Sequence, residues 1–230
     1  MIIMNAISSF FDLLFPDLCK TCNNPLGIGE KIICTSCRHK LPQTDYHLYK
    51  NNEIEKIFYG RSKIEFASSF LYFHKNGLTQ NLIHKLKYKG HQEIGTLIGN
   101  WYGNKLLEEA NLKFDYIIAV PLHRHKEEKR GFNQVDTFGK ALAETFGAEY
   151  SKNNLVRIYK SETQTKKSRF ARWLNVKEIF SLNDRKLFRN KRVLLIDDVI
   201  TTGATLDACC NELHKSEGIE ISIVTIAVTS

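Results

Sequence analysis

The sequence contains no hydrophobic run long enough to cross a membrane and no recognisable secretory signal. Its amino terminus, MIIMNAISSFFDLLFPDLC, is apolar, but it lacks a basic lead, carries Asp12 within the hydrophobic run and has no small-residue cleavage site. We therefore expect no transmembrane segment, and we expect the chain to stay in the cytoplasm. Residues 6–15 are expected to form a short amphipathic helix that docks on the protein itself or, alternatively, on a partner.

Two common phosphate-binding motifs are also missing. A loop for nucleoside triphosphates would read Gly-x4-Gly-Lys-Ser/Thr, and a dinucleotide site would read Gly-x-Gly-x-x-Gly after a strand. Neither pattern occurs, and the sequence shows no internal repeat or low-complexity tract. A phosphate site in this chain must therefore be built on a different loop.

The overall composition is that of an ordinary globular protein, with 43% hydrophobic and 25% charged residues and a formal net charge of +8. The positive charge is concentrated between Lys160 and Arg192, where eleven Lys and Arg residues face only three acidic ones. Such a segment favours an anionic partner, either a phosphate-rich small molecule or nucleic acid. The alternative interpretation is a solvated lysine-rich face.

Four of the six cysteines form two C-x2-C pairs separated by eleven residues, namely Cys19, Cys22, Cys34 and Cys37. Each pair brings two sulfurs to one ion from a tight turn, and two such turns complete a tetrahedron. In a reducing compartment this pattern predicts a structural Zn²⁺ site, with two redox-active pairs as the alternative. Cys209 and Cys210 share a helical stripe with Leu206 and Leu213 and are expected in the core.

Apolar periodicity predicts strands that alternate with helices, and so an α/β fold with a doubly wound, mostly parallel sheet. We expect a helix and zinc module at 1–45, a linker at 46–60 and the main domain at 61–230. The expected strands are 64–73, 114–122, 193–196 and 221–228; the expected helices are 78–89, 94–101, 135–146 and 205–217; a charged loop is expected at 123–134.

The stretch LLIDDVITTGATL, residues 194–206, carries the chemistry. Asp197 and Asp198 are expected at the carboxyl end of a strand, where ligands bind in such sheets. The small residues that follow lead into a helix, so that backbone amides and the helix N-terminus can hold an anion. Vicinal sugar hydroxyls suit the carboxylates, and a ribose 5-phosphate unit therefore matches the stretch. The alternative is two acids that cap an ordinary turn.

This stretch resembles the phosphoribosyl pyrophosphate signature of type I phosphoribosyltransferases. The rest of the chain is similar to one branch of them, the ComF (competence protein F) family. The likeness covers nearly the whole sequence, from the cysteine module through three further blocks to the signature itself. These blocks are KYKG (87–90), AVPL with KRGFNQ (119–134) and TQTKKSRFARWLN (163–175).

The resemblance implies roles for particular residues. The ribose hydroxyls would be held by Asp197 and Asp198, and pyrophosphate would be displaced at the ribose anomeric carbon with Mg²⁺ as cofactor. Residues 121–130 would grip the pyrophosphate, and residues 164–172 would close over the site. The full set of phosphoribosyl pyrophosphate-binding residues would be Thr201, Thr202, Gly203, Ala204, Thr205, Leu122, Lys126 and Arg130, and the closing segment would use Gln164, Lys166, Lys167, Arg169 and Arg172.

Members of the ComF family are associated with natural transformation, the uptake of single-stranded DNA. The resemblance thus leaves two functions open: a phosphoribosyltransferase, or a non-catalytic module that binds single-stranded DNA or competence-machinery proteins such as a DNA-uptake helicase. The basic segment favours DNA, because it is interleaved with aromatic residues on which bases can stack. These residues are Phe170, Trp173, Phe180 and Phe188. The alternative is a core position for Phe180 and Phe188 and a helix anchor for Trp173.

Overall fold

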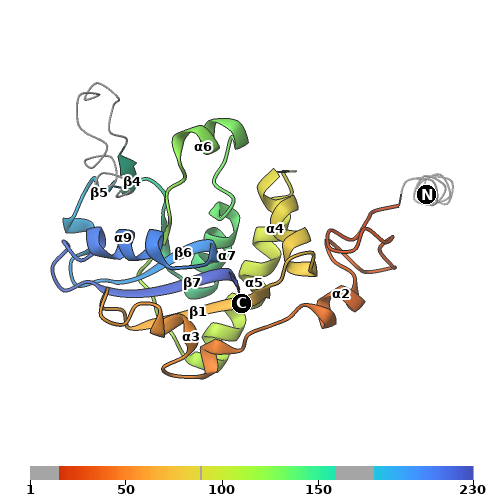
Figure 1. Cartoon of the computed structure of the whole chain (residues 1–230), viewed down its shortest axis with the longest axis horizontal. Coiled ribbons are helices and arrows are strands. Elements are labelled where there is room, and N and C mark those ends of the chain that lie inside the picture. The colour runs from red at the N-terminus through yellow and green to blue at the C-terminus, as the bar shows by residue number, and fades with distance from the viewer. Residues whose placement is uncertain (1–15, 89, 159–178, 230) are drawn as a thin grey trace.

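The structure is a computed structural model that describes residues 16–88, 90–158 and 179–229 (Figure 1). Its centre is a five-stranded parallel sheet that consists of β1 (Phe66–Phe73), β2 (Tyr116–Ala119), β3 (Glu149–Ser151), β6 (Arg192–Ile200) and β7 (Glu220–Thr229). The strand order is β1-β7-β6-β2-β3. Leu194 of β6 pairs with Ile117 of β2 on one side and with Ser222 of β7 on the other. The predicted α/β class with a mostly parallel sheet is confirmed.

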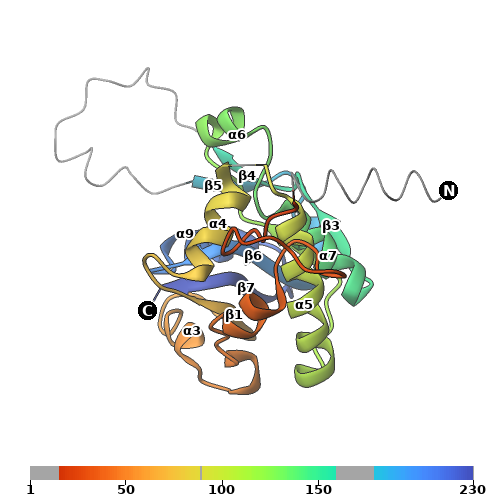
Figure 2. The ribbon, with the colours of Figure 1, turned by 90° about the vertical axis from the view of Figure 1, so that its right-hand side faces the viewer.

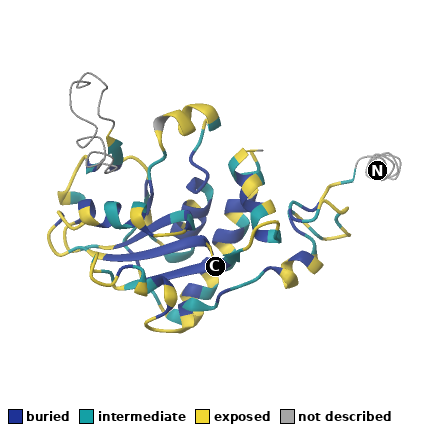
Figure 3. Ribbon diagram, viewed as in Figure 1, coloured by how far each residue is buried: buried dark blue, intermediate teal, exposed yellow. Residues whose placement is uncertain are grey.

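Helices cover both faces of the sheet (Figure 1). One face carries α4 (Leu78–Tyr88), α5 (Glu93–Ala110) and α7 (Asp136–Phe146), and the other carries α9 (Ala204–Leu213). Side chains of a strand point alternately to the two faces, so each strand feeds two separate cores. In β6, Leu194 and Ile196 join the core under α4, α5 and α7, whereas Val193 and Leu195 join the core under α9. The strands are accordingly buried along most of their length (Figure 3).

Cys209 and Cys210 lie fully buried in the core under α9, as the helical stripe predicted. The expected helix at 205–217 is shorter, since α9 ends at Leu213. Among the described residues, no helix combines the length and apolar character that a membrane crossing requires. The amphipathic helix expected at 6–15 lies outside the described part of the chain.

The helix expected at 94–101 continues to Ala110, and two further expectations are wrong. The charged loop at 123–134 contains a helix, α6 (Arg124–Arg130), because the His123 side chain accepts a hydrogen bond from the His125 amide and Gly131, with φ of 75°, ends it. A helix without apolar residues leaves no periodic signal in the sequence. The strand expected at 193–196 continues to Ile200, so Asp197 and Asp198 lie inside β6 rather than after it.

A second, two-stranded antiparallel sheet pairs β4 (Leu155–Ile158) with β5 (Ile179–Leu182). Leu182 is buried in the core under α9, together with Phe180 of the same strand. The 3₁₀ turn η3 (Lys186–Phe188) then leads into β6, and the Phe188 side chain is also fully buried. These two aromatic residues of the basic segment are therefore core residues.

The cysteine module rests against α4 and α5 (Figure 2). The Asn81 side-chain amide donates to the Thr21 carbonyl at 3.1 Å, and the Arg38 guanidinium lies 4.6 Å from the centre of the Trp101 ring. The module contains the short helix α2 (Thr35–Lys40). Its core residues continue directly into the core under α4, α5 and α7, so module and sheet share one hydrophobic cluster.

Residues 46–60, expected as a linker, carry two short elements, η1 (Tyr46–Leu48) and α3 (Glu53–Lys56). The Asn52 side chain caps α3 by accepting from the amides of Ile54 and Glu55, and its NH₂ donates to the Ala67 carbonyl of β1 at 2.9 Å. Ile54 is fully buried in the core under α9. This segment is packed against the sheet.

Candidate functional site

The loop between β6 and α9 encloses a small cavity of about 60 Å³. Gly203 makes the loop possible, because its φ of 71° is a conformation that side-chain-bearing residues rarely adopt. The first hydrogen bond of α9 follows at once, from the Asp207 amide to the Gly203 carbonyl at 2.8 Å. The cavity is therefore the mouth of a helix N-terminus, and it is lined by Asp197, Val199, Ile200, Thr201, Thr202, Gly203, Ala204, Thr205 and Leu206.

Asp197 shares this cavity with the predicted loop residues 201–205. Its side chain is partly exposed, and its Oδ1 accepts a hydrogen bond from the Asp198 amide at 2.8 Å. The structure thus brings one of the two acids together with the loop amides and threonine hydroxyls. A carboxylate beside a helix mouth can accept from hydroxyls while the amides donate to an anion.

Asp198 has different surroundings, because neighbouring residues of a strand face opposite sides of the sheet. Its Oδ2 lies 2.7 Å from Nζ of Lys87 at the end of α4 and accepts from the Gln134 side-chain amide at 2.8 Å. The side chain of Asp198 is 8% exposed and that of Lys87 is 22% exposed. Asp198 is therefore a largely buried, ion-paired acid that does not line the loop cavity.

Sequence reasoning gave no role to Lys87 or Gln134. Both belong to blocks that carry the family resemblance, KYKG and KRGFNQ. Their place in these blocks was the only indication in the sequence that they belong to the site. Their distance from Asp198 along the chain, 111 and 64 residues, hides the contact, because only the folded sheet brings α4, the start of α7 and β6 together. The site is thus assembled from three separate parts of the sequence.

The three residues predicted to bind the pyrophosphate, Leu122, Lys126 and Arg130, have different surroundings in the structure. Arg130 donates to the Gln134 side-chain oxygen and lies 4.8 Å from the centre of the Tyr88 ring, so it stands next to the Asp198 group. Lys126 is exposed on α6, and Leu122 is partly buried after β2; neither lines the loop cavity. The predicted closing segment, with Gln164, Lys166, Lys167, Arg169 and Arg172, lies outside the described residues.

The four predicted cysteine ligands converge. Their sulfur atoms all lie within 4.8 Å of one another, and Sγ of Cys22 is 3.9 Å from Sγ of Cys34. A tetrahedral ion with metal–sulfur bonds of about 2.3 Å requires sulfurs about 3.8 Å apart. Cys19 and Cys37 are buried and the other two are partly buried. The cluster therefore has the donor set and spacing to hold a metal ion.

Backbone amides support these sulfurs. The amides of Thr21 and Cys34 donate to Sγ of Cys19 at 3.4 and 3.3 Å. Burial opposes ionisation of the Cys19 thiol, but the surrounding amide hydrogen bonds outweigh it and lower its pKa to about 6. Burial raises the pKa of Cys37, so further thiolates need a cation to compensate their charge.

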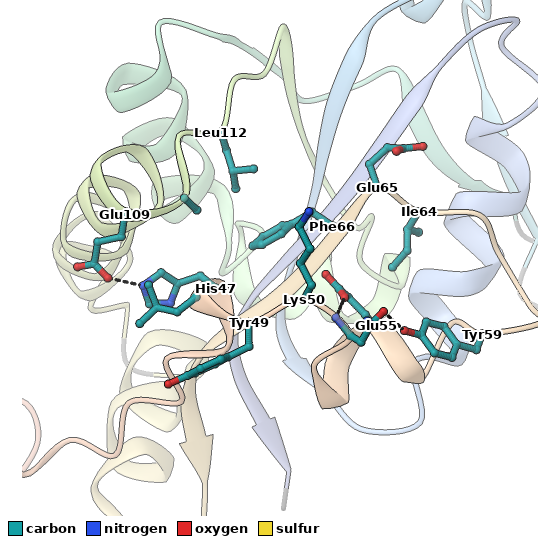
Figure 4. Close-up of a pocket in the computed structure, with 13 residues that line it drawn as sticks. His47, Tyr49, Lys50, Glu55, Tyr59, Ile64, Glu65, Phe66, Glu109 and Leu112 are labelled. Carbon is teal, nitrogen blue, oxygen red and sulfur yellow. Dashed lines mark hydrogen bonds and ion pairs between the residues drawn. The ribbon is translucent and has the colours of Figure 1, made fainter.

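A larger cavity of about 570 Å³ lies at the other end of the strands, where β1 begins and α5 ends (Figure 4). His47 and Glu109 form part of its wall and are joined by a 2.8 Å contact between Nε2 and Oε2. Tyr49 and Tyr59 also line it and are more than half exposed. None of the site residues predicted from the sequence lines this cavity, so volume alone does not identify the candidate site.

Comparisons with known proteins agree with this geometry. The phosphoribosyl transferase domain family matches residues 135–229, which include the loop cavity and both acids. The DNA utilization protein YhgH of Escherichia coli O157:H7 is 28% identical over 227 residues, covering 92% of this chain and 96% of that protein. Competence protein ComFC of Bacillus subtilis is 26% identical over 217 residues, 93% of this chain and 86% of that protein. Competence protein F of Haemophilus influenzae is 36% identical over 112 residues, about half of each chain.

Two solved structures superpose on part of the chain. Glutamine phosphoribosylpyrophosphate amidotransferase from B. subtilis gives a TM-score of 0.40 with 20% identity, covering 61% of this chain and 30% of that one. Purine phosphoribosyltransferase from Pyrococcus horikoshii gives 0.39 with 19% identity, covering 58% and 73%. This chain spans less than a third of the amidotransferase, and at these scores the superpositions add nothing to the sequence matches.

The parallel sheet and the matched domain define a phosphoribosyltransferase-like protein. The relatives that align over most of its length confirm the resemblance carried by the sequence blocks. Within this class, the names of these relatives support a ComF-family, phosphoribosyltransferase-like protein.

Proposed function

We propose that the protein binds phosphoribosyl pyrophosphate at the carboxyl edge of the sheet, with the 5-phosphate in the cavity of loop 201–205 and a ribose hydroxyl on Asp197. The observation that carries the proposal is the shared cavity: one carboxylate and the mouth of α9 face the same small space. A phosphate alone would be repelled by the acid, whereas a ribose 5-phosphate offers hydroxyls to the carboxylate and an anion to the amides.

The reaction that this binding mode supports is pentosyl transfer to an acceptor nucleophile. A bond forms between the ribose anomeric carbon and the acceptor, the bond from that carbon to the pyrophosphate oxygen breaks, and pyrophosphate leaves with the electron pair. Positive charge develops on the ribose ring, and the carboxylate of Asp197 would stabilise it. Arg130, which contacts Gln134 and the Tyr88 ring, would approach the leaving pyrophosphate.

The site also suits Mg²⁺, which prefers oxygen ligands and binds through one or two carboxylates together with substrate phosphates. Asp197 is the better carboxylate for this role, because Oδ2 of Asp198 already faces Lys87 and Gln134. Among the described residues, the cysteines form the only cluster of three or more metal-ligating side chains. Bound Mg²⁺ would thus take most ligands from the pyrophosphate and water, and it would supply charge neutralisation for the leaving group.

Calorimetric titration with phosphoribosyl pyrophosphate and Mg²⁺ tests the proposal. Wild-type protein should bind, and Asp197→Asn should weaken binding by about 2 kcal/mol, the worth of a hydrogen bond to a charged group. Glu220→Gln, a matched acidic position exposed at the amino end of β7, should bind like wild type. Absence of heat from the wild type, or equal affinity of Asp197→Asn, would reject this ligand.

We further propose that the four cysteines hold one structural Zn²⁺. Four sulfurs leave no open position for catalysis, so the ion would serve the fold of the amino-terminal module. A cytoplasmic location belongs to this proposal, because cysteines grouped in this way hold zinc in a reducing compartment.

A second candidate function, single-stranded DNA binding in competence, is favoured by the names of the relatives and by the basic segment between Lys160 and Arg192. The stacking part of this hypothesis now rests on fewer residues, because Phe180 and Phe188 are buried. Phe170 and Trp173 lie outside the described residues. The charge argument is unaffected.

Salt dependence distinguishes this second function. Single-strand binding should weaken steeply with salt, and replacing Lys166, Lys167 and Arg169 by Ala should reduce the slope of log K against log salt by about 2. Replacing the exposed Lys31, Lys40 and Lys50 by Ala provides a control with the same change in net charge. A slope that falls equally in both triple variants would mean that the basic segment is not the binding surface.

A further inference from the structure

The outer side of the phosphate loop is contacted by residues 57–62, which come from the amino-terminal half of the chain. Nη1 of Arg61 donates to the Thr202 carbonyl at 2.9 Å. Ile57 lies beneath Gly203, where an added Cβ would come within 2.5 Å of Ile57 Cγ2. Arg61 lies 141 positions before Thr202, and both Arg61 and Ile57 lie outside the matched domain at 135–229.

The same segment also holds the first turn of α9. Oγ of Ser62 donates to Oδ1 of Asp207 at 2.5 Å, and Nε of Arg61 lies 3.8 Å from Oδ2 of the same carboxylate. Arg61 is 38% exposed on its side chain, and it does not line the loop cavity. It therefore acts on the loop from behind and does not face a ligand in the cavity.

The contact with Thr202 has a geometric consequence. The peptide bond between Thr202 and Gly203 is trans, so the Thr202 carbonyl and the Gly203 amide point to opposite sides of the peptide plane. With the carbonyl directed at Arg61, which does not line the cavity, the Gly203 N–H points away from Arg61, and Gly203 itself lines the cavity. This amide belongs to the set that would donate to a bound phosphate.

Gly203 alone does not fix this orientation. Glycine adopts positive and negative φ about equally well, so the 202–203 peptide can rotate and turn its carbonyl into the cavity. A carbonyl oxygen there would repel a phosphate. A donor behind the loop selects one of the two orientations, and the structure provides one in the Arg61 guanidinium.

We propose that Arg61 is a positioning residue for the phosphate loop: it holds the Thr202 carbonyl outward and thereby keeps the Gly203 amide directed at the phosphate of the ligand. This inference rests on the proposed phosphoribosyl pyrophosphate site. It gives residues outside the matched domain a part in ligand affinity.

The first test combines affinity with a signal from the amide itself. Arg61→Ala should weaken phosphoribosyl pyrophosphate binding about tenfold, roughly the loss of one charged hydrogen bond. In ¹⁵N-labelled protein, the large ligand-induced shift of the Gly203 amide should be lost. Arg61→Gln, which lacks the charge but keeps a donor, should retain more than half of that shift and bind within about threefold of wild type.

Two matched variants separate positioning from simple anchoring. Ser62→Ala removes a bond to Asp207 but leaves the Thr202 carbonyl contact, and Arg189→Ala removes an exposed arginine paired with Glu217 on another part of the surface. Both should keep wild-type affinity and the Gly203 shift. Thermal unfolding of every variant shows that each is folded under the conditions of the titration.

The failures are distinguishable. If wild-type protein binds no phosphoribosyl pyrophosphate, the proposed function fails; inorganic phosphate then serves as the probe, and Arg61→Ala must still abolish its effect on the Gly203 amide. If wild type binds but Arg61→Ala keeps both affinity and shift, the positioning role is wrong. It is also wrong if Ser62→Ala loses as much as Arg61→Ala, or if Arg61→Gln behaves like Arg61→Ala.

Discussion

The cysteine cluster and the acid pair of β6 are built in opposite ways. The cluster takes its four sulfurs from 19 consecutive residues, and hydrogen bonds within this segment, such as that from the Lys20 amide to the Ile32 carbonyl at 2.7 Å, join the two C-x2-C turns so that the sulfurs lie within 4.8 Å of one another. Asp197 and Asp198 are adjacent in sequence, yet one lines the loop cavity and the other is paired with Lys87 on the opposite face. The spacing of residues within one short segment thus determines the cysteine cluster. In a strand, by contrast, adjacent side chains point to opposite faces of the sheet, so their contacts depend on elements that are distant in the sequence.

This difference gives the two sites different sensitivities. A local site depends on its own ligands and on the ion that joins them. The acid pair depends on α4, the start of α7 and β6 holding their positions, so changes in distant side chains should act on it through the fold. Three experiments, taken from the largest expected effect to the smallest, can break or sharpen this comparison.

The largest effect is expected from Cys37→Ser. The variant should hold far less than one zinc per chain and should unfold at a clearly lower temperature, because zinc binding contributes on the order of 10 kcal/mol to the folding of small zinc modules. Metal analysis and thermal unfolding with and without a chelator measure both. Cys209→Ala, at a buried cysteine in the other core, should keep a full complement of zinc. Undiminished zinc in Cys37→Ser would show that the cluster does not hold the ion.

An intermediate effect is expected at the acid pair. Asp198→Asn and Lys87→Met should each lower the free energy of unfolding by about 2 kcal/mol, because each leaves a largely buried partner without its counter-charge. The double variant should recover most of the loss, since it removes both charges together. Urea titration measures the three values. Strictly additive losses would mean that the pair does not couple α4 to β6.

The exposed pair between Lys56 and Glu53 is the control for that cycle. Its side chains are 50% and 65% exposed, so solvent screens the interaction. Glu53→Gln should change the free energy of unfolding by less than about 0.5 kcal/mol. A loss as large as that of Asp198→Asn would show that burial does not set the size of these effects.

Among the three experiments, and leaving the controls aside, the smallest effect is expected at Asn52, in the segment that the sequence suggests is a linker. Asn52→Ala removes the cap of α3 and the bond to Ala67 of β1, and it should cost about 1–2 kcal/mol. Asn100→Ala, at an exposed position inside α5, should be neutral or slightly stabilising. Equal urea midpoints for Asn52→Ala and wild type would mean that residues 46–60 contribute no stability to the fold and act only as a linker.

Patterns with a short period carry most of what the sequence predicts. Strand β1 and helices α4 and α7 follow from apolar spacing, and the loop at 201–205 follows from its small residues between a strand and a helix. The same kind of pattern predicted that β6 ends at Ile196, because two adjacent acids are typical of the end of a buried strand. In the structure the strand runs on to the buried Ile200, with Asp198 neutralised by Lys87.

Contacts between distant residues were not predictable from one sequence. No local pattern links Lys87 or Gln134 to Asp198, and none links Arg61 to Thr202, because these contacts exist only once the sheet order is set. Helix α6 was missed for a different reason: its residues are nearly all charged, and its limits come from a histidine cap and a glycine stop. Capping chemistry at single residues is weaker in the sequence than a periodic stripe.

The chain just after the cysteine module also protects one margin of the sheet. Residues 42–44 run antiparallel along β1: the Thr44 amide donates to the Phe70 carbonyl at 3.0 Å, and the Tyr72 amide donates to the Pro42 carbonyl at 2.8 Å. Without this cover, an eight-residue and mostly buried strand would present unpaired backbone groups to other molecules. If the proposed ion fixes the cysteine module and the chain that follows it, its removal should expose β1, and concentration-dependent self-association should be measurable before the rest of the domain unfolds.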